Sequence, residues 1–176
     1  METKVFSPQI ISASRRTDIP AFYSDWFMNR IKAGYVQYRN PFGGQTHEVS
    51  LKPEAVTAFV FWSRNYKPLL RYLDTLTRQG YCFYFHFTIN GYPRDLENQV
   101  PPLEKAIEML KTLADKYSPD HVQWRFDPII LSNKTPADYI LDLYGRIAKD
   151  LQGATRRCYL SFVDFYRKTD RNLSKL

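Results

Sequence analysis

The sequence predicts an α/β fold: a partial or open TIM-like (β/α) barrel with a mainly parallel sheet of about six strands. Short apolar segments of strand length alternate with longer segments that have helical spacing, a pattern typical of βα units. Six strand-like segments occur, and the chain stops just after the sixth. A complete eight-unit barrel takes about 250 residues, so a chain of 176 residues is short for one.

Composition and length indicate one soluble domain over residues 1–176, which we expect to be a fragment of a longer barrel. Hydrophobic residues make up 44% of the chain and aromatic residues 16%, which argues against disorder. No apolar run approaches the roughly 18 residues of a membrane span, and the N-terminus lacks the pattern of a signal peptide. The two cysteines, Cys82 and Cys158, fit a reducing compartment. We therefore expect a cytoplasmic protein.

The first half of the chain contains three predicted strands and two predicted helices. The strands are "QIISAS" (9–14), "YVQYRN" (35–40) and "AVTAFVFWS" (55–63), and the helices are "DWFMNRIKAG" (25–34) and "KPLLRYLDTLTRQG" (67–80). Gly34 and Gly80 terminate the two helices, as glycine often does. Between them, "PFGGQTHEVSLKP" (41–53) predicts a loop or short hairpin with Gly43–Gly44 at its turn.

The second half repeats the alternation. Its predicted strands are "YCFYFHFTI" (81–89), "HVQWRFDPII" (121–130) and "RRCYLSFVDFY" (156–166), and its predicted helices are "PLEKAIEMLKTLADKY" (102–117) and "TPADYILDLYGRIAKDL" (135–151). Pro128 is expected to end its strand. Thr135 is the predicted N-cap of the last helix, with Pro136 at the first helical position.

Polar residues recur where the predicted strands end. These ends read "SRRTD" (14–18), "WSRN" (62–65), "HFTIN" (86–90), "RFDP" (125–128) and "FVDFY" (162–166). Ligands of parallel α/β sheets bind at the carboxyl ends of the strands. Because side chains alternate along a strand, Trp124 and Phe126 would face the helices while Arg125 and Asp127 face the barrel axis. The sequence therefore predicts a polar site at these ends.

Candidate roles follow from the side-chain chemistry. Asp127, His86 and Asp18 are the candidate catalytic groups, because carboxylates and imidazoles transfer protons. The candidate substrate-binding residues are Arg16, Arg64, Asn65, Thr88, Arg125 and Asp164. Of these, Arg16 and Arg125 would bind a carboxylate or phosphate.

Each candidate also has a structural interpretation. Arg125 and Asp127 would form an ion pair, Asp18 would cap the first helix, and Asn65 would be a turn residue. His86 would be a hydrogen-bonded core residue, and Asp164 would pair with a nearby arginine. No metal ligand is assigned.

The net charge of +7 favours a phosphate-bearing small molecule or a nucleic acid as partner. No DNA- or RNA-binding motif occurs, and GxGxxG, P-loop, HExxH and GxSxG motifs are absent. Two alternative functions stay open: a basic nucleic-acid-binding module without catalytic activity, and a metal-dependent hydrolase on the same barrel.

At "SASRRTDIPAFYSDWF", "YRNPF", "FWSRN", "WRFDPII" and "SFVDFY" the sequence resembles a bacterial family of unknown function, the DUF1848 proteins. The resemblance extends over essentially the whole chain. Members of that family are longer and carry a C-terminal cysteine cluster that resembles the iron–sulfur site of radical S-adenosylmethionine (SAM) enzymes. The resemblance thus implies the barrel portion of a radical-SAM-like enzyme of unknown substrate, served by a 4Fe–4S cluster and SAM.

The chain departs from that family pattern because it contains no CxxxCxxC motif, so no cluster ligand can be assigned. Cys82 and Cys158 lie in strand patterns, and cluster ligation takes several thiolates. We expect either a truncated chain or a version of the family that has lost the cluster. Alone, the chain is not expected to perform radical chemistry, and whether it is an enzyme is left open.

Overall fold

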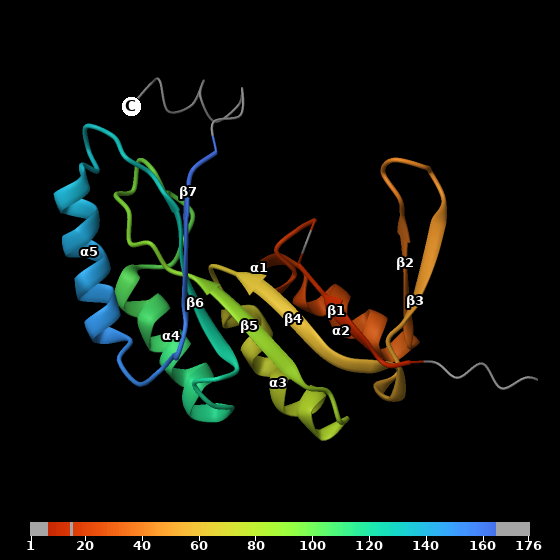
Figure 1. The fold of residues 1–176 in the computed structure, drawn as a ribbon. Coiled ribbons are helices and arrows are strands. Elements are labelled where there is room, and N and C mark those ends of the chain that lie inside the picture. The colour runs from red at the N-terminus through yellow and green to blue at the C-terminus, as the bar shows by residue number, and fades with distance from the viewer. Residues whose placement is uncertain (1–6, 15, 165–176) are drawn as a thin grey trace, which may run out of the picture. The chain divides into compact units, whose positions relative to one another are not determined.

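The computed structural model of the chain describes residues 7–14 and 16–164 (Figure 1). Its internal contacts divide the chain into two compact units, residues 1–85 and 86–176, and the division falls within one strand.

Unit 1 contains the N-terminal strands and helices. Its elements are β1 (Gln9–Ser12), α1 (Ile19–Phe22), α2 (Ser24–Ala33), β2 (Tyr35–Arg39), β3 (Thr46–Ser50), the short 3-10 helix η1 (Pro53–Ala55), β4 (Val56–Ser63), α3 (Lys67–Arg78) and the start of β5 (Phe83–Thr88). Unit 2 contains the end of β5, then α4 (Leu103–Lys116), β6 (Val122–Ile129), α5 (Ala137–Asp150) and β7 (Cys158–Phe162).

The described strands form two sheets, one of five strands in the order β1-β4-β5-β6-β7 and one made of β2 and β3. The β1–β4 and β6–β7 pairs are parallel. The predicted α/β class and parallel sheet are therefore confirmed, with five strands rather than about six in the described part of the chain. A TIM barrel is not confirmed.

The sequence places residues 35–40 among the strands of the parallel sheet, and this prediction is wrong. β2 pairs with β3 in an antiparallel hairpin, with Tyr38 opposite His47. Residues 40–45 are too short a connection for a parallel crossover, which takes a dozen or more residues, but long enough for a hairpin turn. Gly44 adopts a positive φ of 67° in that turn, in agreement with the predicted loop or hairpin.

Unit 1 is held together by aromatic residues of β4 against helices α2 and α3. Phe59 and Phe61 are fully buried, and their rings lie 5.1 and 5.5 Å from the ring of Phe27 on α2 in edge-to-face geometry. Three leucines spaced along α3, at 69, 73 and 76, are also fully buried. These leucines form the apolar side of α3 that packs into the core of unit 1.

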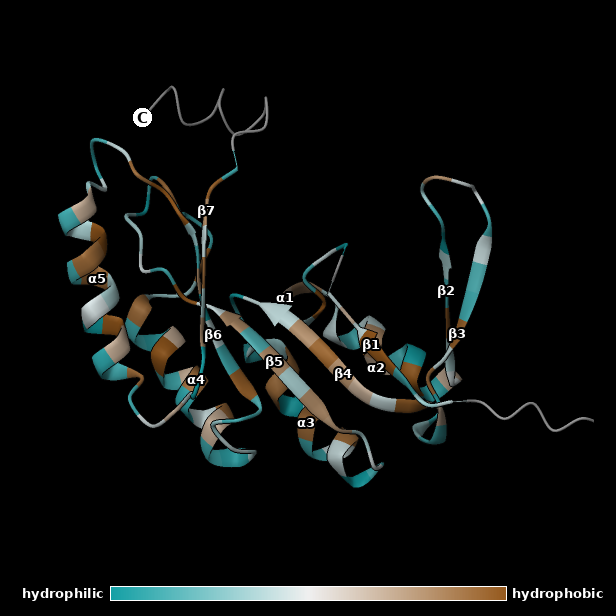
Figure 2. Cartoon of the chain, in the orientation of Figure 1, coloured by the Kyte–Doolittle hydropathy of each residue, from teal (hydrophilic) through white to brown (hydrophobic). Residues whose placement is uncertain are grey.

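Unit 2 buries the apolar face of β6 that the sequence predicts. Val122, Trp124 and Phe126 are at most 2% exposed. The Trp124 ring stacks on Tyr144 of α5 at 5.1 Å, and its indole Nε1 donates a hydrogen bond of 2.9 Å to the carbonyl of Ile89. Figure 2 shows hydrophobic and hydrophilic residues alternating along α4 and α5, as in helices with one apolar side.

Two local predictions in unit 2 are wrong. Pro128 does not end its strand, because β6 continues to Ile129. The pairing register with β7 shifts between Phe126 and Ile129, which accommodates a residue that has no N–H for the ladder. Thr135 does not cap α5: Pro136 occupies the N-cap position, and the Thr135 hydroxyl donates instead to the carbonyl of Ile130 at 2.8 Å.

No helix within residues 7–14 and 16–164 is both long enough and apolar enough to cross a membrane.

Gly91, which follows β5, provides a test of the packing in unit 2. Its φ is +69°, and a Cβ there would lie 3.1 Å from Leu103 Cδ2 and 3.3 Å from Leu143 Cδ1. We expect Gly91→Ala to lower the free energy of unfolding by about 1–3 kcal/mol, because it adds both backbone strain and overpacking. Urea denaturation measures the loss.

The matched control is Gly145→Ala in the exposed part of α5, where an added Cβ meets nothing within 4 Å. This variant should gain about 0.5–1 kcal/mol from helix propensity. Equal effects of the two substitutions would contradict the described packing around Gly91.

Candidate functional site

A partly buried ion pair occupies the polar face of β6 in unit 2. Arg125 Nε donates to Asp127 Oδ1 at 3.2 Å, and a second contact joins Arg125 Nη2 to Asp127 Oδ2. The side chains are 18% and 13% exposed. The guanidinium also lies over the ring of Tyr159, 5.3 Å from its centroid, because β7 pairs with β6 in a register that sets Tyr159 beside Arg125. Two parallel hydrogen bonds to a carboxylate fix the orientation of an arginine.

His86 of β5 belongs to the same cluster. It is 7% exposed, and its ring contacts that of Tyr159 edge-to-face at 5.4 Å. The pKa of His86 is lowered to about 4, chiefly by burial and also by the charge of Arg125, while the charge of Asp127 acts in the opposite direction. The imidazole is therefore neutral at physiological pH.

The backbone that carries Asp127 is held by side chains from the loop after β5. Asn90, which is 1% exposed, donates from Nδ2 to the carbonyl of Asp127 at 3.1 Å. The hydroxyl of Tyr92 donates to the carbonyl of Pro128 at 3.0 Å and accepts from the N–H of Ile130 at 3.1 Å. These bonds fix the carboxyl end of β6, where the bond between Asp127 and Pro128 is cis.

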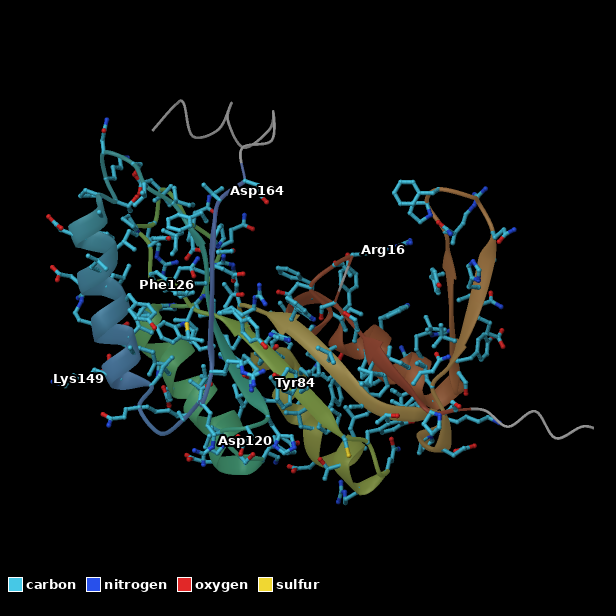
Figure 3. All side chains as sticks on the ribbon, in the orientation of Figure 1. Arg16, Tyr84, Asp120, Phe126, Lys149 and Asp164 are labelled. Atoms are coloured by element: carbon cyan, nitrogen blue, oxygen red, sulfur yellow. The ribbon has the colours of Figure 1, made fainter. Side chains whose placement is uncertain are left out.

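The remaining predicted residues of unit 2 lie differently. Thr88 is half-buried and lies two positions after His86, so the two share a face of β5. Asp164 is exposed and lies beyond the end of β7 at Phe162 (Figure 3). It forms no ion pair with any arginine of the described residues, so the predicted pairing is not observed.

In unit 1, Asp18 caps a helix, which is the structural role that the sequence offers as one of two interpretations. Its Oδ1 accepts from the N–H of Ala21 at 3.0 Å and caps α1, and its Oδ2 accepts from the hydroxyl of Ser63 at 2.9 Å. Burial raises the pKa of Asp18, and the hydrogen bonds from Ala21, Ser63 and the backbone of Arg64 reduce that rise. A catalytic role for Asp18 stays a prediction.

Asn65 and Arg64 lie at the carboxyl end of β4. The side-chain oxygen of Asn65 accepts from the N–H of Lys67 at 3.0 Å, so Asn65 is a turn residue that leads into α3. Arg64 is half-buried, and its backbone N–H binds Asp18. The structure thus brings Asp18, Arg64 and Asn65 together through Ser63.

Arg16 reaches the β2–β3 hairpin. Its Nη1 donates to the carbonyl of Arg39 at 2.9 Å, and its guanidinium lies 5.6 Å from the ring centroid of Tyr38 (Figure 3). Arg16 is exposed and forms no ion pair with any described residue.

Sequence reasoning misses the residues that surround these candidates. Tyr159 and Ser161 share a face of β7, and the Ser161 hydroxyl lies 3.5 Å from Asp127 Oδ2. Their alternation within "CYLSF" is visible in the sequence, but the register that sets them beside β6 is not. Ser63 lies inside the quoted "WSRN" and Asn90 inside the quoted "HFTIN", but neither is among the candidate residues.

The described residues do not fit an iron–sulfur cluster. Among them, no group of three or more His, Cys, Asp or Glu side chains is arranged to hold a metal ion. Cys82 is exposed, whereas Cys158 is half-buried, and burial raises the pKa of its thiol and disfavours the thiolate that would bind iron.

Comparison with known proteins identifies one family. Residues 10–176 match the family model described as "Domain of unknown function (DUF1848)", which covers nearly the whole chain. Neither the search of curated proteins nor the search of solved structures gave a match.

The ion pair of β6 should contribute to stability. We expect Arg125→Met to lower the free energy of unfolding by about 2–4 kcal/mol, because it leaves the Asp127 carboxylate unpaired in a site with little water. Replacing both residues, as Arg125→Met with Asp127→Leu, should cost less than the single substitution.

Urea denaturation measures both losses, and Lys105→Met is the control. This substitution breaks the ion pair with Glu108, whose side chains are 69% and 65% exposed, and it should lower the free energy of unfolding by less than about 0.5 kcal/mol. A similar small cost for Arg125→Met would show that Asp127 is better solvated than its exposure indicates.

His86 should make stability depend on pH in a defined window. The unfolded chain binds a proton at this histidine below a pKa of 6.5, and the folded chain binds one only below a pKa of about 4. Between these values the unfolded state holds more protons, so the free energy of unfolding rises as pH increases from 4 to 6.5.

We expect His86→Gln to reduce this slope between pH 5 and 6.5, measured by urea denaturation, while His121→Gln at an exposed position keeps it. An NMR titration that gives His86 an ordinary pKa near 6.5 would refute the assignment.

Proposed function

The chain belongs to the DUF1848 family, and we propose that unit 2 forms the substrate-binding part of an enzyme that acts on a small polar or anionic molecule. The site would lie on the polar face of β5, β6 and β7, toward the carboxyl ends of these strands. The observation that carries the proposal is the nearly buried Arg125–Asp127 pair beside the neutral His86. Clusters of ionisable groups with perturbed pKa values occur preferentially at functional sites.

The ion pair offers a substrate both kinds of hydrogen-bonding group. The Arg125 guanidinium has five N–H donors in a planar fork, and the Asp127 carboxylate has several lone pairs. A carboxylate, phosphate or carbonyl oxygen of the substrate would bind toward Arg125, and an N–H or O–H group toward Asp127. A substrate that carries only negative charge would compete with Asp127 for the same guanidinium, so a molecule with both groups fits best.

His86 is proposed as a hydrogen-bonding group rather than as the main base. A neutral imidazole has one donor and one acceptor nitrogen. Its pKa of about 4 makes it a weak proton acceptor at neutral pH, because general bases work best when their pKa lies near the working pH. Asp127 is then the stronger candidate for proton transfer within this cluster. Thr88, on the same face of β5 as His86, would contact the substrate.

The radical-SAM part of the family expectation has no supporting residues in the described chain. A 4Fe–4S cluster needs several thiolate ligands. In the described part of the chain, neither Cys82 nor Cys158 belongs to a group of three or more side chains that could hold a metal. No step of the proposed function is assigned to a cluster or to SAM.

A panel of small polar molecules would test the proposal. Each molecule should have fewer than about twelve heavy atoms, and the panel should include acids, amides, amines and amino acids. Binding is detected by saturation-transfer NMR, and the site is mapped by the Nε–Hε signal of Arg125 and the ring signals of His86. We expect compounds with an acidic oxygen and a neighbouring N–H or O–H group to bind and to shift these signals.

Two variants serve as the test and its control. Asp127→Asn should weaken binding at least about tenfold, because it removes the charge that positions Arg125 and accepts from the substrate. Asp120→Asn changes an exposed carboxylate, paired with Arg156, at the amino end of β6 and should leave binding unchanged (Figure 3). Binding that is insensitive to Asp127→Asn in a folded protein, or no binding by any member of the panel, would reject the proposed site.

A further inference from the structure

Unit 1 contains a cavity of about 480 Å³ between β1, α2 and the β2–β3 hairpin. This volume falls within the range of about 300–1,000 Å³ that is typical of small-molecule sites. Its apolar wall includes Phe27, Val36, Val49, Leu51 and Phe59, several of them almost fully buried. The helix and hairpin that enclose the cavity are both seen in Figure 1.

Aromatic side chains flank the mouth of the cavity. Trp26 of α2 and Tyr38 of β2 both line it, and both are 44% exposed. Tyr38 is held in place by stacking on His47 at 5.3 Å and by the guanidinium of Arg16 over its ring. An apolar cavity with aromatic groups at its mouth suits a ligand with a flat or aliphatic apolar body.

Two arginines line the same cavity, and neither has an acidic partner among the described residues. Arg30 of α2 forms no hydrogen bond or ion pair with a described side chain, and its Nε is shielded from solvent without an acceptor. Among the described residues, Arg16 donates a hydrogen bond only to the carbonyl of Arg39. No aspartate or glutamate is among the described lining residues. Shielded donors without an acceptor are costly, and a charged acceptor would satisfy them best.

We infer that this cavity binds a small amphipathic anion, with its apolar body against the wall and its carboxylate or phosphate group toward Arg30 and Arg16. The apolar wall alone would accept a neutral ligand. The two guanidinium groups without carboxylate partners add a preference for negative charge, since arginine matches both carboxylate and phosphate geometry. The inference concerns unit 1 alone and does not depend on the proposed function of unit 2.

The test compares three probes with the same apolar body: 1-naphthylacetate, 1-naphthyl phosphate and the neutral 1-naphthaleneacetamide. Binding to the full chain is followed by the indole N–H signal of Trp26. Trp124, which is 2% exposed and bonded to Ile89, serves as the internal reference. We expect the anions to shift the Trp26 signal and to bind at least about tenfold more tightly than the amide, because hydrogen bonds to charged groups are the stronger ones.

Arg30→Met retains an unbranched apolar side chain and removes the guanidinium, so it should bring the affinity for the anions down to that for the amide. Arg16→Met should reduce the preference for the anions in the same direction and provides a second variant at an exposed position. Arg78→Met, the same substitution at an exposed position in the last turn of α3, is the control and should change nothing.

The relative affinity of the two anions distinguishes the two classes of ligand. Tighter binding of the phosphate would identify a phosphate ester as the ligand class, and tighter binding of the acetate a carboxylic acid; either supports the inference. Equal affinity of anions and amide for the unmodified chain would overturn it. So would an unchanged preference in both Arg30→Met and Arg16→Met, or a Trp26 signal that no probe shifts.

Discussion

The burial of Trp124 sets the orientation of β6, and the polar cluster of unit 2 depends on it. The indole is fixed by its bond to the carbonyl of Ile89 and by its stacking on Tyr144, so the strand cannot turn this face away from the helices. Because side chains alternate along a strand, Arg125 and Asp127 must lie on the other face. A slip of one residue would put both charges among the apolar side chains of the helices and expose the tryptophan, which makes the register strongly specified.

Arg125 and Asp127 form an ion pair at hydrogen-bonding distance, and burial sets the protonation of two groups near them, His86 and Cys158. Burial, together with the charge of Arg125, keeps the His86 imidazole neutral at physiological pH. Burial likewise raises the pKa of the nearby thiol of Cys158 and keeps it protonated. The ion pair places a donor group and an acceptor group side by side, and the proposed substrate, with both an acidic oxygen and an N–H or O–H group, would complement both.

The sequence predicts the features of this chain that depend on local periodicity, and it fails where distant pairing decides. The alternation in "HVQWRF" correctly separates the buried face of β6 from its polar face. Helices α2 to α5 follow from their apolar spacing, with glycine stops after α2 and α3. The strand at residues 35–40 is assigned to the wrong sheet because strand-like composition does not reveal the partner strand. Pro128 stays within β6 because a register shift against β7 absorbs its missing N–H, and no local signal encodes that shift. The site is predictable to the same extent: Arg125 and Asp127 are found by alternation, whereas Tyr159 depends on register.

The arginines of the two units show why residue type alone does not identify a binding group. Arg125 looks like an anion-binding residue in the sequence, but the carboxylate of Asp127, two positions away, already occupies part of its fork. Arg30 looks like an ordinary helix-surface residue, since it stands in the last turn of α2, where a basic side chain favours the helix dipole. The hairpin helps to enclose Arg30 in an apolar cavity whose described lining residues include no carboxylate. Whether an arginine is available to a ligand is decided by what its neighbours already provide, and those neighbours come from segments that only the tertiary structure brings together.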